Sequence, residues 1–345
     1  PVKLKDLYGR VAKLLGKSIG RKLTSIECCL LIDEAAVTIV AGNIRRSAGM
    51  RQFASDDTSA AGAKENLWQQ DSEGNWRIDP ERDALRMANH TRVYHTRPSR
   101  DVLLEAVTRQ FHSGEGAIQF APEALARSNA DLLSTQELRS EFIEIYCDQG
   151  RQEAGLWLQQ NHGPISEEEL EHRLSRYGLN PCGEILGADF HCNLAEVHLN
   201  QIDPKDEDSQ RDAFRAGALS VACLLNHNFE VDRYRQSRAW DPIVGVSFTG
   251  LFDFFVHAFG TPWLKWWEAG RPETEEGLNY KKQEAEYLKR WKSIVNETVW
   301  DYCDRHDLRR PNRCTTVQPA GTKSLLTGAA PGWHPPKAQR FIRRI

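Results

Sequence analysis

The sequence lacks the cysteine patterns that would mark a metal module or a disulfide framework. Its eight cysteines in 345 residues include no Cys-x-x-Cys pair and no cysteine–histidine spacing typical of zinc sites. We therefore expect no metal site, and such thinly scattered thiols fit the reducing cytoplasm. Six of them are expected to be ordinary core or surface thiols: Cys28, Cys29, Cys147, Cys223, Cys303 and Cys314.

Long apolar runs are also missing. No stretch approaches 18 apolar residues, so we expect no membrane span, and the first residues carry no pattern of a signal peptide. Neither repeats nor low-complexity tracts occur. With 40% apolar and 27% charged residues, the composition is that of an ordinary globular protein.

Net charge is small, at −3, but it is unevenly distributed. Residues 301–345 hold nine Lys or Arg and only three Asp. A basic segment of this kind attracts phosphate groups, either of nucleotides or of nucleic acid. A solvated charged surface without a ligand is the alternative.

The most informative feature is the segment 180–184, Asn-Pro-Cys-Gly-Glu. In an extended segment, residues two apart point to the same face. Asn180, Cys182 and Glu184 would then place a hydrogen-bonding amide, a sulfur centre and a general base in one small site. A free cysteine taken alone is more often a small core residue.

This segment and a second one, Cys192-Asn-Leu-Ala-Glu-Val, together resemble the active-site region of ribonucleotide reductases. The likeness is greatest to the adenosylcobalamin-dependent branch, in particular the monomeric ribonucleoside-triphosphate reductases. Residues 40–48 (Val-Ala-Gly-Asn-Ile-Arg-Arg-Ser-Ala) are similar to an upstream signature, and residues 316–322 (Thr-Val-Gln-Pro-Ala-Gly-Thr) to a downstream phosphate loop. The resemblance runs from about residue 23 to 345 and is weakest over 131–179 and 263–300.

Alternating strand and helix patterns predict an α/β architecture. The resemblance implies part of a ten-stranded α/β barrel with an internal finger loop that carries Cys182. Residues 1–345 would form a partial catalytic barrel domain, with 131–176 as a helical surface insertion. Because the chain starts at Pro1 and stops within a motif, we expect a fragment. The resemblance implies that N-terminal strands, the effector region and a C-terminal tail are missing from it.

Local patterns predict individual elements. The sequence Thr24-Ser-Ile-Glu27 reads as a capping box for a helix that ends near Gly42. Residues 54–80 are expected to be loop, and Ser99 to cap a helix that stops near Gly114. We further expect strands at 116–120, 244–248 and 315–317, and helices at 212–225, 251–259, 281–306 and from 322 onward.

The resemblance assigns roles to single residues. Cys182 would carry a thiyl radical that removes the 3′ hydrogen of a ribose, and Glu184 would take the proton of the 3′ hydroxyl. Asn180 would bind the substrate hydroxyls. Cys192 would be one of two reducing thiols, whose partner precedes the matched region. The substrate phosphates would bind a cradle made of Pro319, Ala320, Gly321, Thr322, Lys323 and Ser324.

Two other segments of the sequence have no catalytic role that we can derive. Asn43, Arg45, Arg46 and Ser47 are expected to support the barrel. The sequence has Asn89-His90 where the family more often shows two asparagines, which puts a role of His90 in doubt.

The expected activity is reduction of ribonucleoside triphosphates to deoxyribonucleotides for DNA synthesis. Adenosylcobalamin is implied as cofactor by resemblance alone, because the sequence has no Asp-x-His-x-x-Gly signature. The implied partners are a thioredoxin-type dithiol reductant and a deoxynucleotide effector, with no nucleic acid and no membrane. Two alternatives stay open: a reductase subunit that imports its radical from a metal-containing partner, and a non-catalytic nucleotide- or nucleic-acid-binding fragment. Whether diphosphates or triphosphates are reduced also stays open.

Overall fold

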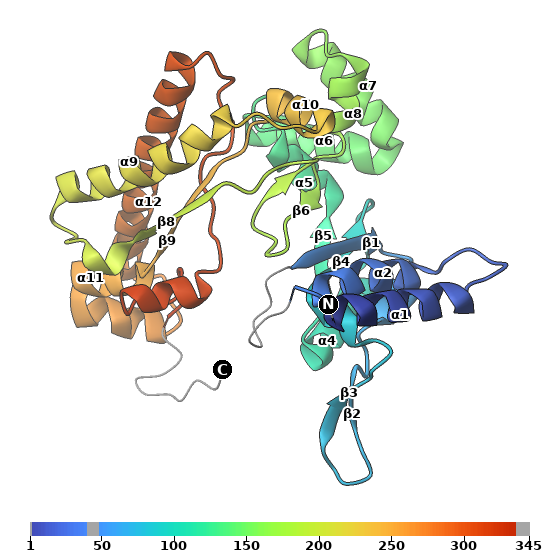
Figure 1. The fold of residues 1–345 in the computed structure, drawn as a ribbon. Coiled ribbons are helices and arrows are strands. Elements are labelled where there is room, and N and C mark those ends of the chain that lie inside the picture. The colour runs from blue at the N-terminus through green and yellow to red at the C-terminus, as the bar shows by residue number, and fades with distance from the viewer. Residues whose placement is uncertain (1, 40–47, 336–345) are drawn as a thin grey trace. The chain divides into compact units, whose positions relative to one another are not determined.

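A computed structural model describes residues 2–39 and 48–335. The chain divides into two compact units, Pro1–Leu186 and Gly187–Ile345, and each is described by itself (Figure 1). The signature at 40–47, with Asn43, Arg45, Arg46 and Ser47, lies outside the described residues, as does the chain after 335.

The first unit contains helices around a small parallel sheet. Its helices are α1 (Val2–Lys17), α2 (Ser25–Val37), α3 (Thr58–Gly62), α4 (Arg100–Ser113), α5 (Ala121–Ser128), α6 (Gln136–Gln149), α7 (Arg151–His162) and α8 (Glu167–Arg173). Its strands are β1 (Gly49–Ala54), β2 (Trp68–Gln70), β3 (Trp76–Ile78), β4 (Ala88–Tyr94), β5 (Ala117–Phe120) and β6 (Gly178–Leu179), and β7 (Leu186–Gly187) crosses the boundary to the second unit.

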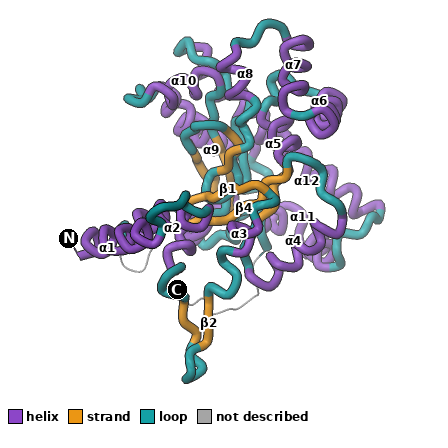
Figure 2. Tube along the Cα trace, turned by 90° about the vertical axis from the view of Figure 1, so that its right-hand side faces the viewer, coloured by secondary structure: helices purple, strands orange, loops and turns teal. Residues whose placement is uncertain are grey.

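The parallel sheet has the strand order β1-β4-β5, and Figure 2 shows β1 and β4 side by side. Partners in register lie on the same face of a sheet, and side chains alternate between the two faces. Thr91 pairs with Gln52 on one side and Ala117 on the other, so these residues share a face with Asn89 and Gln119. His90 and Arg51 point to the opposite face, on which Arg51 pairs with the buried carboxylate of Asp33 from α2.

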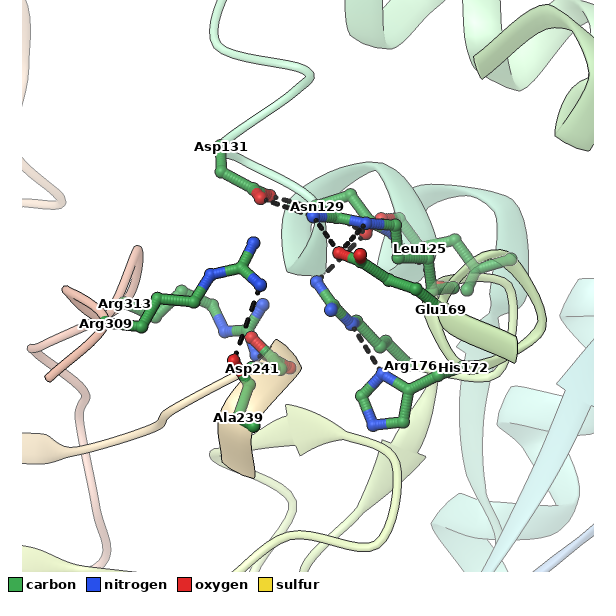
Figure 3. Close-up of polar contacts among 11 residues, drawn as sticks. Leu125, Asn129, Asp131, Glu169, His172, Arg176, Ala239, Asp241, Arg309 and Arg313 are labelled. Atoms are coloured by element: carbon green, nitrogen blue, oxygen red, sulfur yellow. Dashed lines mark hydrogen bonds and ion pairs between the residues drawn. The ribbon is translucent and has the colours of Figure 1, made fainter. Parts of the chain in front are cut away.

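Helices α5 to α8 pack around their own apolar core, which includes Leu125, Phe142 and Leu158. A buried polar network joins α5 to α8 (Figure 3). Asn129 Oδ1 accepts hydrogen bonds of 3.1 Å from both Arg173 and Arg176. Since an arginine is rarely buried without partners, these contacts explain how two guanidinium groups are accommodated in the interior.

The second unit places long helices against a parallel pair of strands. Its elements are β8 (Leu194–His198), α9 (Glu207–Ala222), α10 (Asp232–Trp240), β9 (Gly245–Thr249), α11 (Leu251–Glu268), α12 (Glu275–Arg305) and a 3-10 helix, Gly321–Leu326. Val197 and Val246 belong to a core that continues into α9, α11 and α12, with Phe254 and Trp291 at its centre. Asp241 is buried and forms an ion pair of 2.7 Å with Arg313 (Figure 3).

Several predicted elements are confirmed. Thr24 and Glu27 form the capping box of α2, and Ser99 caps α4, which ends at Gly114 in the left-handed conformation. The strands expected at 116–120 and 244–248 are β5 and β9, and residues 131–176 are mostly helical. Whether that helical stretch is an insertion stays a prediction.

Other predictions need correction. Residues 54–80 are not all loop: Asp57 caps α3 by accepting from Ala60, and β2 and β3 form a hairpin. The expected strand at 315–317 is reduced to one bridge between Thr315 and Val246. The helix expected from 322 is the six-residue 3-10 helix. Within the described residues no helix is both long enough and apolar enough to cross a membrane.

The α/β prediction is confirmed, with parallel strands in both units. A closed ten-stranded barrel is not seen among residues 2–39 and 48–335, so barrel closure stays a prediction.

Candidate active site

The segment 180–184 forms a tight loop between the short strands β6 and β7, which make a two-stranded sheet. The N–H of Gly183 donates to the carbonyl of Asn180 at 2.9 Å, and Gly183 has a φ of +77°, a conformation that favours glycine. The segment is therefore a turn and not an extended strand, so the argument from alternating faces does not hold here. The turn places Cys182 and Glu184 in the wall of a groove, whereas Asn180 is buried.

Asn180 shapes this loop from within. Its side-chain Oδ1 accepts from the backbone N–H groups of Glu184 and Ile185, both at 3.1 Å, and the residue is buried. Cys182 is exposed at the turn. The buried amide thus holds the loop closed while the thiol faces outward.

Three amide side chains of the parallel sheet anchor the loop and the strand before it. Gln52 accepts from the N–H of Leu179 at 2.9 Å and donates to the carbonyl of Tyr177 at 3.0 Å. Gln119 donates to the same carbonyl at 2.8 Å, and Asn89 donates to the carbonyl of Pro181. All three lie on the same face of β1-β4-β5, so that face is the platform on which the loop is built.

A groove of about 710 Å³ runs beside the loop within the first unit. Its walls are formed by Met50, Asn89, residues 114–120 and the loop residues Cys182 and Glu184, among others. This volume falls in the range of small-molecule and cofactor sites. The exposed thiol therefore borders a cavity that can take a ligand.

The register of the strands places His90 on the opposite face of the same sheet from Asn89. Its side chain is buried, and burial, together with the nearby charge of Lys64, lowers the pKa of His90 to about 4. Lys64 donates to the carbonyl of Ala88 and pairs with Glu115 at 2.9 Å. A neutral, buried histidine fits structural support of the strand.

Cys192 belongs to the second unit and is exposed just before β8. The neighbouring His191 ring stacks 4.1 Å from Phe229 and 5.2 Å from Tyr234, measured between centroids. The guanidinium of Arg238 lies 4.4 Å from the centroid of the Phe229 ring. Burial lowers the pKa of His191. A cationic and aromatic cluster thus adjoins the second thiol.

The predicted phosphate cradle lies in the second unit, along the edge of β9. Gly321 has a φ of +53°, and Ser324 is buried with its hydroxyl donating to the carbonyl of Gly321 at 2.8 Å. The 3-10 helix that contains most of the cradle has only six residues, so it carries too few aligned peptides for a helix dipole to attract the phosphates. Lys323 is half exposed and forms a 3.1 Å ion pair with Glu196 of β8.

The sequence pattern did not identify Gln52, Gln119 and Glu196 as parts of the site, and it noted Asn89 only as the neighbour of the departure at His90. Each of these residues pairs with one that is distant in the sequence. Gln52 donates to Gln119, which is 67 residues away, and Glu196 accepts from Gln318, which is 122 residues away. A lone amide in a strand carries no local signal. Pairing of distant strands was needed to find them.

The sequence and fold of the chain can be compared with those of known proteins. No protein-family model matches the chain. Over its whole length it is similar to curated proteins named adenosylcobalamin-dependent ribonucleoside-triphosphate reductase, with 25% identity to those of Levilactobacillus brevis and Lacticaseibacillus paracasei and 24% to that of Lactobacillus leichmannii. The chain spans only 40–41% of the length of these relatives.

A crystal structure of a B12-dependent (class II) ribonucleotide reductase superposes with a TM-score of 0.63 at 18% identity, covering 97% of this chain and 40% of that one. The predicted resemblance is thereby confirmed: over its whole length the chain is similar to a part of the proteins named adenosylcobalamin-dependent ribonucleoside-triphosphate reductase, and it shares the fold of the corresponding part of the class II ribonucleotide reductase structure.

Proposed function

We propose that the complete gene product reduces ribonucleoside triphosphates to 2′-deoxyribonucleoside triphosphates, and that this chain supplies its radical loop and phosphate cradle. The observation that carries the proposal is the turn 180–184, which presents an exposed Cys182 beside a groove. The names of the relatives support the same reaction.

Cys182 is assigned as the thiyl residue. The radical on sulfur takes the hydrogen atom from C3′ of the ribose, which forms an S–H bond and leaves a carbon radical. Glu184 takes the proton of the 3′ hydroxyl, and the 2′ hydroxyl, protonated by a thiol of the reducing pair, leaves as water. Asn180 is assigned to the substrate hydroxyls on the strength of the resemblance, since an amide can both donate and accept hydrogen bonds.

The two electrons come from a pair of thiols. Overall, a ribonucleotide and two thiols give a deoxyribonucleotide, a disulfide and water. Cys192 is assigned as one of the two thiols, and its partner is expected outside residues 1–345. A thioredoxin-type dithiol would reduce the disulfide after each turnover.

Adenosylcobalamin is the proposed cofactor, and the groove next to Cys182 is wide enough for part of a large ligand. Apolar walls from Met50, Ile118 and Leu186 suit an organic cofactor. When bound, the cofactor supplies the radical by homolytic cleavage of its cobalt–carbon bond. The chain itself contributes the exposed sulfur that receives the radical.

Residues 319–324 are assigned to the substrate phosphates, and a deoxynucleotide effector is expected to bind elsewhere. Among the described basic residues of the C-terminal segment, Arg305, Arg310, Arg313 and Lys323 pair with carboxylates. This partial neutralisation of the described stretch supports a small phosphate ligand over a nucleic-acid polyanion.

Turnover of the complete gene product tests the proposal. Cys182→Ser and Glu184→Gln should each abolish reduction of a ribonucleoside triphosphate, with an unchanged circular dichroism spectrum. Cys223→Ser, at another exposed cysteine of the chain, is the matched control and should keep full activity. Retained turnover in Cys182→Ser would refute the proposed function.

A further inference from the structure

Glu196 is a buried charge beside the phosphate cradle, and the reaction chemistry above gives it no task. It lies on β8 in register with Ser247 of β9. Its side chain is only 4% exposed. A carboxylate with so little contact to water needs protein partners.

The partners of Glu196 come from the cradle segment. Its Oε2 accepts from Gln318 Nε2 at 2.8 Å and lies 3.1 Å from Lys323 Nζ. The N–H of Gln318 in turn donates to Ser247 Oγ at 3.0 Å. Glu196 and Ser247, on neighbouring strands, therefore hold Gln318, which directly precedes the cradle, and Lys323 within it.

The other oxygen of the carboxylate, Oε1, is also buried and accepts no hydrogen bond within the described part of the chain. The pair between a buried carboxylate and the half-exposed Lys323 contributes little net stability, because taking the carboxylate out of water offsets most of the attraction. Glu196 is thus poorly explained as a stabilising residue. Its contacts point to the placement of Lys323.

We propose that Glu196 is a positioning residue that holds Lys323 and Gln318 in place for the phosphate oxygens of a nucleoside triphosphate. This inference rests on the proposed function of residues 319–324 as a phosphate cradle. An ammonium group has three donors, so a lysine that gives one to Glu196 keeps others for an anion. Holding a long side chain in one position lowers the entropy lost when the anion binds.

The alternative is that Glu196 competes with the phosphate for Lys323. The two roles predict opposite results when the charge is removed. If Glu196 positions the lysine, Glu196→Gln weakens triphosphate binding. If it competes, the same variant tightens binding, because a negative charge near the phosphates is gone.

The experiment is a double-mutant cycle with the full 345-residue chain, measured by calorimetric binding of a ribonucleoside triphosphate and of the same nucleoside without phosphates. Glu196→Gln should weaken triphosphate binding about tenfold, the effect of losing one charge-assisted hydrogen bond. It should leave nucleoside binding unchanged. In a Lys323→Met background the same substitution should have almost no further effect, because it acts through the lysine.

Each outcome has one meaning. If Lys323→Met does not change triphosphate binding, the cradle assignment is wrong and the inference falls with it. If Lys323→Met weakens binding but Glu196→Gln has no effect, an additive effect or a tightening effect, the cradle stands and the inference is overturned. Only the coupled loss supports it.

Two further variants guard against a folding artefact. Glu196→Asp keeps the charge but withdraws the carboxylate by one methylene, and it should lose a similar share of affinity. Glu286→Gln removes the acidic partner of Lys282 in an exposed pair on α12, with 75% and 62% exposed side chains, and should change nothing. A nucleoside affinity equal to that of the parent chain certifies each variant as folded.

Discussion

The loop at 180–184 and the segment at 318–324 solve the same structural problem in different ways. Both are irregular segments supported by one face of a parallel sheet. The first is held by neutral amides from Gln52, Asn89 and Gln119, whereas the second is held by the buried carboxylate of Glu196. An amide donates and accepts without bringing a charge, whereas a carboxylate fixes a cation.

The difference matches the proposed chemistry of each segment. Hydrogen-atom transfer to a thiyl radical moves no net charge, so neutral supports suffice around Cys182. Phosphates carry several negative charges, so their cradle needs a cation that is kept in position. The type of anchor thus separates the proposed radical loop from the proposed anion-binding segment.

The largest expected effect concerns thiol reactivity. The thiols of Cys182 and Cys192 are exposed, whereas Cys303 and Cys314 are buried. Burial raises the pKa of Cys303 to about 11 and that of Cys314 to about 12. The thiolate is the reactive form, so the two exposed thiols should react with iodoacetamide about a hundredfold faster or more. Peptide mass spectrometry over time measures the four rates, and equal rates would contradict the described burial.

The next prediction concerns the face of the sheet that lies opposite the 180–184 loop, and the pH dependence of stability that His90 causes there. His90 is neutral when folded, because its pKa is lowered to about 4, and it takes up a proton near pH 6.5 when unfolded. The unfolded state therefore binds more protons between these values, and stability falls as the pH drops from 6.5 towards 4. Relative to His90→Asn, the parent chain should lose up to about 3 kcal/mol in its free energy of unfolding across this window.

Urea unfolding of both proteins from pH 7 to pH 4 gives this difference, and the subtraction cancels the contributions of the carboxylates. The thiol reactivity of Cys182 at pH 7 should be the same in both proteins, because His90 points away from the loop. A pH-independent difference would mean that His90 is not buried as described.

A smaller effect tests the neutral anchor directly. Gln52→Leu leaves the N–H of Leu179 without its acceptor and removes a donor from the carbonyl of Tyr177. The carbonyl of Tyr177 keeps its bond from Gln119, so one half-buried N–H is left unpartnered, which should lower the free energy of unfolding by about 1 kcal/mol. Hydrogen exchange at Leu179 should accelerate accordingly, whereas the exposed Gln69→Leu should change neither quantity. An unchanged exchange rate at Leu179 would show that Gln52 does not anchor the loop.

The sequence predicted the parts of the molecule that depend on neighbouring residues. The capping box at Thr24 and the helix from Ser99 to Gly114 follow from local hydrogen bonds, and the motif around Cys182 carries its own signal. The hairpin at residues 68–78 was missed because its strands are only three residues long.

The anchors were missed for a different reason. Gln52 and Glu196 gain their roles only when strands far apart in the sequence pair and bring them beside a loop. The conformation of the 180–184 loop was also mistaken, since Pro181 and Gly183 favour a turn over an extended segment. Local patterns identified the chemical groups, and tertiary pairing decided how they are held.

The most direct test of the central claim, that Cys182 carries the radical, is electron paramagnetic resonance. The complete gene product would be mixed with adenosylcobalamin, a ribonucleoside triphosphate, a deoxynucleotide effector and a dithiol, and frozen within milliseconds. We predict a signal of a thiyl radical coupled to cobalt that is absent in Cys182→Ser and present in Cys223→Ser. The same signal in Cys182→Ser, or none in the parent protein while nucleotide and cofactor are bound, would contradict the account.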